Sequence, residues 1–300
     1  MICVGVDAGG TTTIAATSED GAFRREARGP GANPTTLGVD DAADVIITTI
    51  RDALGGADPA AIHVGAAGSG RAKVAENLRE LIVLAFRHAK VAVGDDAAIA
   101  LRAAIPDGAG AVLIAGTGSV AYAEHGARAQ LAGGLGYLAG DEGSAFWIGM
   151  QAVKLYGRVL DGRATRDETT DLVARTLDAP DRERYVAALY DAPLKPAKVA
   201  SLAPSIIAFA GKGNRASTKI VQAAALELGD LVKSALRAVE LLDASPRIAL
   251  AGRLFAENSL LSFLIETRLN GDVAGAAIVK GGDAPVRGAL RLAERAASAP

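Results

Sequence analysis

The sequence predicts an α/β protein in which the same arrangement, βββαβαβα, is present in two domains. Two similar turns rich in glycine and threonine support this prediction, Asp7–Thr13 and Gly116–Ser119, each lying between two apolar, strand-like segments. A hairpin with such a tip can offer backbone N–H groups and hydroxyls to a phosphate, because glycine allows a close approach and a positive φ. The first turn alone is equally compatible with an ordinary tight hairpin. Its repetition about a hundred residues later indicates a duplicated fold that grips a nucleotide from both sides.

Residues 1–106 are expected to form the N-terminal domain. Short apolar runs joined by the Asp20-Gly21 pair indicate an antiparallel meander, since Asp-Gly favours a two-residue hairpin turn. After a loop rich in glycine and proline, Thr35 or Thr36 is a suitable N-cap for a helix to about residue 54. The predicted strands are 2–6, 14–17, 23–27, 62–66 and 90–93, and the further helices are 73–88 and 97–104.

Residues 107–283 are expected to form the C-terminal domain, which begins with a second meander. Ser144 is a good N-cap for a helix that runs to about residue 160. A helical insertion is expected over about 167–243, and the final helix, about 284–298, is a candidate to pack back on the N-terminal domain. The predicted strands are 111–114, 120–124, 128–131, 248–251 and 276–279, a further helix is 258–269, and the insertion is expected to break at Pro180, Pro193, Pro204 and 211–213.

The composition excludes several classes of protein. The chain has 300 residues, enough for two domains of roughly 100–200 residues each. A net charge of −2 gives no electrostatic reason to expect nucleic acid or a membrane surface as a partner. The single cysteine, Cys3, cannot form a disulfide, a zinc site or an iron–sulfur cluster within one chain. Without a signal sequence or an apolar stretch of about 18 residues, we expect a soluble, cytoplasmic protein.

Several short motifs, in a fixed order, carry a resemblance to a known family. The most specific is the block Gly-Asp-Glu-Gly-Ser-Ala-Phe-Trp at 140–147. The other matching pieces are Asp7–Thr11, Gly29–Asn33, Gly65–Gly68, Gly94–Ala98, Gly116–Ser119, Gly133–Gly136, Ala251–Arg253 and Ala284–Ala289. The chain resembles the BadF/BadG/BcrA/BcrD-type ATPases of the hexokinase/actin-like superfamily, and within them N-acetylglucosamine kinases and bacterial glucosamine kinases. The resemblance implies two actin-like (ribonuclease H-like) domains with a nucleotide cleft between them.

The resemblance also implies an activity, the ATP-dependent phosphorylation of an amino sugar or hexose. N-acetylglucosamine or glucosamine, converted to the 6-phosphate, is the first expectation, with Mg²⁺ as the metal and a homodimer as a possible assembly. Two alternatives stay open: an ATPase that activates a dehydratase or reductase, and a non-catalytic sugar-sensing protein. The activator role requires cysteines for a cluster between two subunits, and Cys3, in a strand expected to be buried, does not suit it.

The resemblance assigns catalysis to Asp96, which follows a strand and begins a helix. A carboxylate there can accept the proton of the sugar hydroxyl; a mere helix cap is the alternative, and Asp95 is the less favoured base. The resemblance implies that Asp7 holds Mg²⁺ through water, as is usual in the superfamily; the alternative is that it only stabilises the turn. The expected ATP contacts are Gly9, Gly10, Thr11, Thr117, Gly118, Ser119, Gly252 and Arg253.

For the sugar, the resemblance nominates residues from both domains. Asn33 can read a hydroxyl or an N-acetyl group, and Asp141 can accept bonds from two hydroxyls; their structural alternatives are a turn residue and a charge near a helix N-terminus. Leu135 stands where N-acetylglucosamine kinases typically carry tryptophan, so the aromatic face is lost and the identity of the sugar is left open. The expected sugar contacts are Asn33, Gly68, Asp96, Gly116, Thr117, Leu135, Gly136 and Asp141.

Overall fold

The computed structural model describes residues 1–191, 195–255 and 259–299, and the chain divides into two compact units. The first unit consists of Met1–Gly108 and Gly281–Pro300, and the second of Ala109–Lys280. The second unit is therefore inserted, in sequence, between the two parts of the first. No helix in the described part of the chain is long and apolar enough to cross a membrane.

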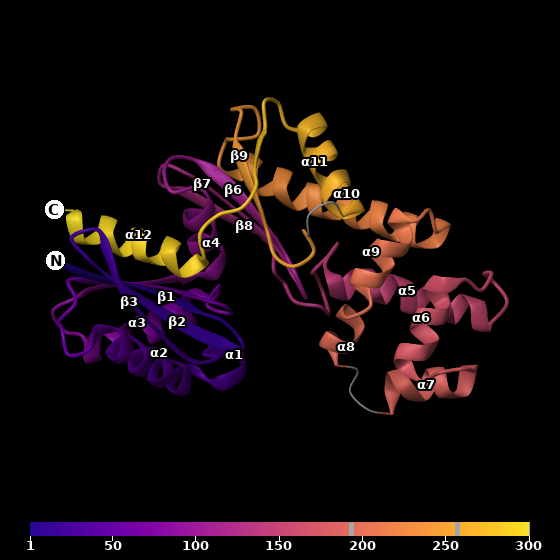
Figure 1. Ribbon diagram of the computed structural model, residues 1–300, viewed down its shortest axis with the longest axis horizontal. Coiled ribbons are helices and arrows are strands. Elements are labelled where there is room, and N and C mark those ends of the chain that lie inside the picture. The colour runs from indigo at the N-terminus through magenta and orange to yellow at the C-terminus, as the bar shows by residue number, and fades with distance from the viewer. Residues whose placement is uncertain (192–194, 256–258, 300) are drawn as a thin grey trace. The chain divides into compact units, whose positions relative to one another are not determined.

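The first unit is a five-stranded mixed sheet with helices on both faces (Figure 1). Its strand order is β3-β2-β1-β4-β5; β1 pairs antiparallel with β2, and parallel with β4, which is followed by β5. The strands are β1 Ile2–Ala8, β2 Thr12–Glu19, β3 Ala22–Pro30, β4 Ala61–Ala66 and β5 Lys90–Asp95. The helices are α1 Pro34–Leu37, α2 Val39–Leu54, α3 Ala72–Ala85, α4 Asp96–Ala104 and α12 Pro285–Ser298.

Alternate residues of β1 pack into two separate apolar layers, one on each face of the sheet, as expected for a strand buried on both faces. Val4 and Val6 pack in the core shared with α2 and α3, whereas Cys3 packs with Val286 and Leu290 of α12. The α12 face of the sheet is so tightly packed that glycine is required. A Cβ at Gly5 of β1 would overlap the backbone of α12, and β1 and α12 therefore meet backbone to backbone.

The second unit repeats the topology of the first. Its strand order, β8-β7-β6-β9-β10, corresponds strand for strand to that of the first sheet, with an antiparallel β6–β7–β8 meander and parallel β9 and β10. The duplicated α/β fold predicted from the two turns is thus confirmed. The strands are β6 Gly110–Ala115, β7 Ser119–His125, β8 Arg128–Gly133, β9 Arg247–Ala251 and β10 Ala277–Val279. The helices are α5 Ala145–Leu160, α6 Glu168–Leu177, α7 Arg182–Tyr190, α8 Pro196–Ala200, α9 Ala203–Gly211, α10 Arg215–Ala238 and α11 Leu260–Asp272.

Two helix predictions were wrong in detail. The helix expected from Thr35 or Thr36 to about 54 is broken at Gly38, whose φ of 93° cannot continue a helix, and its N-cap is Asn33. Pro204 does not break the chain, because it lies in the first turn of α9, where a missing N–H costs nothing. The break predicted at Pro193 and the helix start predicted at Asn258 lie outside the described residues.

Candidate active site

The first turn connects β1 to β2 and is braced by a second loop. The Gly9 N–H donates to the Thr12 carbonyl at 3.0 Å, and the Ala32 N–H donates to the Gly9 carbonyl at 3.0 Å. A Cβ at Gly31 would overlap the Gly10 carbonyl, so only glycine allows the loop to lie on the turn. Gly10 and Thr11 remain exposed. The backbone of the turn is thus held in place from behind while its tip faces solvent.

The glycines of the two turns act by their small size and not by a left-handed backbone. Of the two properties of glycine considered from the sequence, a close approach and a positive φ, the second is not used, because Gly9, Gly10, Gly116 and Gly118 do not have a positive φ. In the second turn, a Cβ at Gly118 would lie 2.8 Å from an oxygen of Asp141. Glycine therefore provides room for a neighbouring group at Gly118, and at Gly9, where a Cβ would lie 3.1 Å from the Thr12 carbonyl oxygen, whereas a Cβ at Gly10 or Gly116 would have nothing within 4 Å.

Three carboxylates lie at the carboxyl ends of parallel strands in the first unit. Asp7 is near the end of β1, while Asp95 ends β5 and Asp96 begins α4. Burial raises the pKa of Asp7. The pKa of Asp96 is raised to about 7. Burial is the largest cause, followed by the charge of Asp95, a hydrogen bond with Asp95, and the charge of Asp7. Asp96 is therefore half ionised close to neutral pH, as suits a proton-transfer group.

Asp95 and Asp96 have different structural positions. The Asp95 Oδ1 atom accepts the Ala97 N–H at 2.9 Å, which makes Asp95 the N-cap of α4. Asp96 is the first residue of the helix. Helix capping was the alternative role considered for Asp95 and Asp96, and in the structure Asp95 has it. Asp96 is therefore not the N-cap, and its carboxyl is hydrogen-bonded to Asp95 and to the backbone of Ala97.

Asn33 and Gly68, both nominated for the sugar, are neighbours in the first unit. Asn33 Oδ1 accepts the Thr35 N–H at 2.8 Å, and Thr35 Oγ1 donates to the Gly68 carbonyl at 3.2 Å. Gly68 has a φ of 83°, and a Cβ there would lie 2.5 Å from Asn33 Oδ1. Within the described residues the Asn33 side-chain NH₂ makes no hydrogen bond, so both of its donors remain for a ligand.

Ser69 is a residue that sequence reasoning missed. Its buried hydroxyl is 2.8 Å from both the Ala66 and the Gly94 carbonyl oxygens, and so it joins the end of β4 to β5 just before Asp95. A Cβ at Gly70 would lie 3.4 Å from Asp95 Oδ2. The signal that could have identified it is a serine between two glycines shortly after a strand.

In the second unit, the turn at 116–119 is closed by the N-terminus of α5. The Ala145 N–H donates to the Gly116 carbonyl at 2.9 Å and the Phe146 N–H to the Thr117 carbonyl at 3.2 Å. Ser144 is the N-cap of α5, as its sequence predicted, and accepts the Trp147 N–H. The positive end of the α5 dipole therefore lies directly against the turn.

The two hydroxyl residues of this turn are not equivalent. Thr117 is exposed, whereas Ser119 is buried and its hydroxyl donates to the Glu142 carbonyl at 2.7 Å. Asp141 is also buried and accepts the Ser119 N–H at 3.3 Å. Burial raises the pKa of Asp141, and the bond from Ser119 opposes this. Ser119 and Asp141 thus hold the turn and the following glycine-rich segment together.

The remaining nominated residues of the second unit lie on either side of this turn. Gly252 has a φ of 101° and no room for a Cβ against the Ala115 carbonyl, which also accepts the Leu254 N–H. The loop after β9 therefore lies beside the end of β6, and Arg253 is exposed there. Leu135, with 74% of its surface accessible, lies in the exposed part of the glycine-rich segment, beside Gly136.

The nominated residues thus form two groups, one in each unit. The first group is Asp7, Gly9, Gly10, Thr11, Asn33, Gly68, Asp95 and Asp96, and the second is Gly116, Thr117, Gly118, Ser119, Leu135, Gly136, Asp141, Gly252 and Arg253. Each group gathers glycine-rich turns and acidic or amide side chains at the end of its sheet where parallel strands finish. Across the described ranges, no three or more His, Cys, Asp or Glu residues lie close enough to hold a metal ion by themselves.

Comparison with known proteins gives consistent matches. The chain is 28% identical over 193 residues to an N-acetylmuramic acid/N-acetylglucosamine kinase of Clostridium acetobutylicum, and this match spans 64% of the chain and 63% of that relative. It is 25% identical over 312 residues to an N-acetyl-D-glucosamine kinase of Dictyostelium discoideum, with 97% of each protein covered.

A solved structure and a family model extend these matches. A protein of Chromobacterium violaceum assigned as an N-acetylglucosamine kinase has a TM-score of 0.74 and 26% sequence identity, with 97% of this chain and 98% of that chain covered. The model of the BadF/BadG/BcrA/BcrD ATPase family matches residues 4–293, and therefore both units and the helix that completes the first. The chain belongs to the BadF/BadG/BcrA/BcrD ATPase family.

Proposed function

We propose that the protein transfers the γ-phosphoryl group of ATP to a hydroxyl of an amino sugar. N-acetylglucosamine and glucosamine are the first candidate acceptors, and the 6-hydroxyl is the proposed position. The observation that carries this proposal is the setting of Asp96, a carboxyl whose pKa is raised to about 7 beside Asp7 and an open glycine turn. The family and the kinases named among the relatives support it.

The proposed reaction needs little covalent chemistry from the protein. The sugar oxygen attacks the γ-phosphorus, the bond from that phosphorus to the β–γ bridging oxygen breaks, and ADP leaves. Asp96 takes the proton of the attacking hydroxyl. Gly9, Gly10 and Thr11 of the first unit, and Thr117 and Gly118 of the second, would contact the phosphates, while the loop at Gly252 and Arg253 would contact the adenosine.

The sugar is proposed to contact Asn33 and Gly68 of the first unit, where the free Asn33 NH₂ group can donate to a hydroxyl or an acetyl oxygen. In the second unit, Leu135 and Gly136 are exposed. Asp141 and Ser119 are instead bonded to each other, so we propose that they act mainly by fixing the shape of the turn. Leu135 offers the sugar an aliphatic face where the related kinases typically carry an indole.

Mg²⁺ is the metal that this chemistry requires, and Asp7 fits it. The Asp7 side chain is a half-buried carboxylate, its pKa is raised by burial, and no cation pairs with it among the described residues. Magnesium in kinases is commonly held by one or two carboxylates, phosphate oxygens and water. When bound, it would neutralise charge on the phosphates. Because the reaction consumes ATP, we also propose a cytoplasmic location.

The first experiment measures ADP release from Mg·ATP with N-acetylglucosamine, glucosamine, glucose, N-acetylmannosamine and N-acetylmuramic acid, and without sugar. We expect release that depends on an amino sugar. The variant Asp96→Asn should lose about 10²–10⁴-fold in turnover and retain sugar binding. Asp52→Asn, at an exposed position of α2, is the matched control. Release that is independent of every sugar, or normal turnover by Asp96→Asn, would contradict the proposal.

A further inference from the structure

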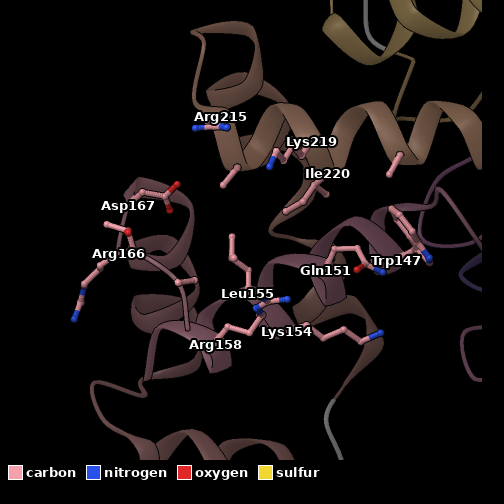
Figure 2. A pocket seen from close by; sticks show the side chains of 14 residues that line it. Trp147, Gln151, Lys154, Leu155, Arg158, Arg166, Asp167, Arg215, Lys219 and Ile220 are labelled. Carbon is pink, nitrogen blue, oxygen red and sulfur yellow. The ribbon is translucent and has the colours of Figure 1, made fainter. Parts of the chain in front are cut away.

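A pocket of about 850 Å³ opens in the second unit between α5, α10 and the segment that leads into α6 (Figure 2). Pockets of about 300–1,000 Å³ are typical of small-molecule sites. None of its lining residues belongs to the candidate active site. The lining residues are Trp147, Gln151, Lys154, Leu155, Arg158, Ala164, Thr165, Arg166, Asp167, Arg215, Ala216, Lys219, Ile220 and Ala223.

The charges of the pocket are strongly unbalanced. Its lining has five positive side chains and a single carboxylate, Asp167. That carboxylate is already engaged, because it caps α6 at the Thr170 N–H and accepts the side-chain NH₂ of Asn214. Arg166 pairs with Asp171. Within the described ranges, the other four cations have no carboxylate partner; they are Lys154, Arg158, Arg215 and Lys219.

Two of these cations are aimed at the same space from opposite walls. In Figure 2, Lys219 from α10 and Arg158 from α5 point into the pocket, whereas Arg166 and Lys154 point away from it. Without a counter-charge, two facing cations repel each other, and an anion between them would replace that repulsion by two attractive contacts. The charges of the lining therefore favour a negatively charged ligand.

Part of the pocket lining is apolar, which indicates that the ligand also has an apolar or ring-shaped part. Leu155 and Ile220 lie between the two walls, and Trp147 lies at the far end with Gln151 (Figure 2). An inorganic anion would fill only the charged part of the 850 Å³. A ring attached to the anion would cover the aliphatic floor or lie against the indole, as rings of sugars and bases do in many sites.

We infer that this pocket binds a small phosphorylated molecule that carries a ring, such as a sugar phosphate or a nucleoside monophosphate. Arg158 and Lys219 hold the phosphate, and Leu155 and Ile220 contact the ring. The charged end of the pocket, at Arg158, is distant from the turn at 116–119, whereas Trp147 directly follows Phe146, which is bonded to that turn. Arg158 follows Ala145, the residue bonded to that turn, by nearly the whole length of α5, which is about 20 Å at 1.5 Å per residue. This inference does not rest on the proposed kinase activity.

The chain provides its own probe for this site. Trp147 is the single tryptophan of the sequence and lines the pocket, so its fluorescence reports on an occupant. The full-length protein is titrated with N-acetylglucosamine 6-phosphate, with AMP, with inorganic phosphate and with N-acetylglucosamine. We expect a saturable change with at least one of the two phosphorylated ring compounds, and affinities at least tenfold weaker for phosphate and for the free sugar. Whichever of N-acetylglucosamine 6-phosphate and AMP binds with the higher affinity shows whether the ligand is a sugar phosphate or a nucleoside monophosphate.

Variants separate this pocket from the candidate active site. Arg158→Ala and Lys219→Ala should each weaken binding by about tenfold or more, because each removes a charge-assisted contact. Lys212→Ala, which replaces an exposed lysine outside the pocket, should bind as the unchanged protein does. Circular dichroism and the melting temperature of each variant check that it folds. A kinase assay without activity would leave these binding results as they are, so the two proposals fail separately.

Several results would overturn the inference. One is the absence of saturation by either phosphorylated ring compound at about 10 mM, a concentration that would detect even weak binding. Another is affinity that is unchanged by both Arg158→Ala and Lys219→Ala, which would place the ligand outside this pocket. A third is a dimer in solution that Lys219→Glu dissociates, since the face would then be an interface between two copies of the chain.

Discussion

Replacement of Asp95 by asparagine should shift the pH dependence of the reaction to lower pH. The general base must be ionised, so kcat/KM should rise with pH through the pKa of Asp96, about 7. Asp95→Asn leaves the burial of Asp96 unchanged, and burial is the largest cause of its raised pKa. The variant removes the second cause, the charge of Asp95, and weakens or removes the third, the hydrogen bond between the two side chains. Asparagine caps helices as well as aspartate does, so α4 should keep its N-cap.

The size of the effect follows from the fraction of Asp96 that is ionised. With a pKa of about 7, roughly a tenth of the Asp96 carboxyls are ionised at pH 6. If the loss of the neighbouring charge brings the pKa to about 6, roughly half are ionised. At pH 6, relative to its own plateau at high pH, Asp95→Asn should therefore be about fivefold more active than the unchanged protein.

The assay is the initial rate of ADP release at subsaturating sugar from pH 5 to 9, in buffers of constant ionic strength. Asp52→Asn, which removes an exposed carboxylate from α2, should follow the profile of the unchanged protein. Two results would refute the reasoning: a flat profile between pH 5 and 8 in the unchanged protein, or an Asp95→Asn profile that coincides with it. The first would mean that Asp96 is not the base, and the second that Asp95 does not control its protonation.

Three further predictions concern stability, measured by denaturant unfolding. Gly288→Ala should cost about 1–3 kcal/mol, because its Cβ would overlap a carbonyl of α4; Gly271→Ala, with nothing within 4 Å of its Cβ, should be neutral or stabilising, and equal effects would contradict this account. Tyr156→Phe should cost about 1–3 kcal/mol, since the buried Ala179 carbonyl loses the hydroxyl 2.6 Å away. Ser144→Ala removes the N-cap of α5 and should cost about 0.5–2 kcal/mol, and an unchanged midpoint would exclude that role.

Local signals explain how far the sequence could predict the fold. Asp20-Gly21 marks a hairpin, and both residues do have positive φ in the structure, because the two-residue turn requires it. Ser144 marks the start of α5 for a similarly local reason, its hydroxyl bonding three residues ahead. Repetition of a glycine turn then suggested the duplication, and the two matching strand orders confirm it.

Contacts between distant residues explain what the sequence could not predict. The Asp141 carboxylate bonds to a backbone N–H 22 residues earlier, and nothing in the local sequence distinguishes it from a carboxylate free to bind a sugar. The contact between Gly31 and Gly10 likewise cannot be predicted from the local sequence, because the two residues meet only in the folded chain. The cations of the α5–α10 pocket are scattered singly in the sequence, and they form a site only because Arg158 and Lys219 come to face each other.

The position of α12 has a consequence for the order in which the protein matures on the ribosome. Val286, Leu290 and Ala293 of this helix cover the Cys3 face of β1, yet the whole second unit lies between them and β1 in the sequence. The whole second unit must leave the exit tunnel before that face is covered. The strand β1 therefore emerges well before α12, and the nascent chain carries an open apolar layer until α12 has been made.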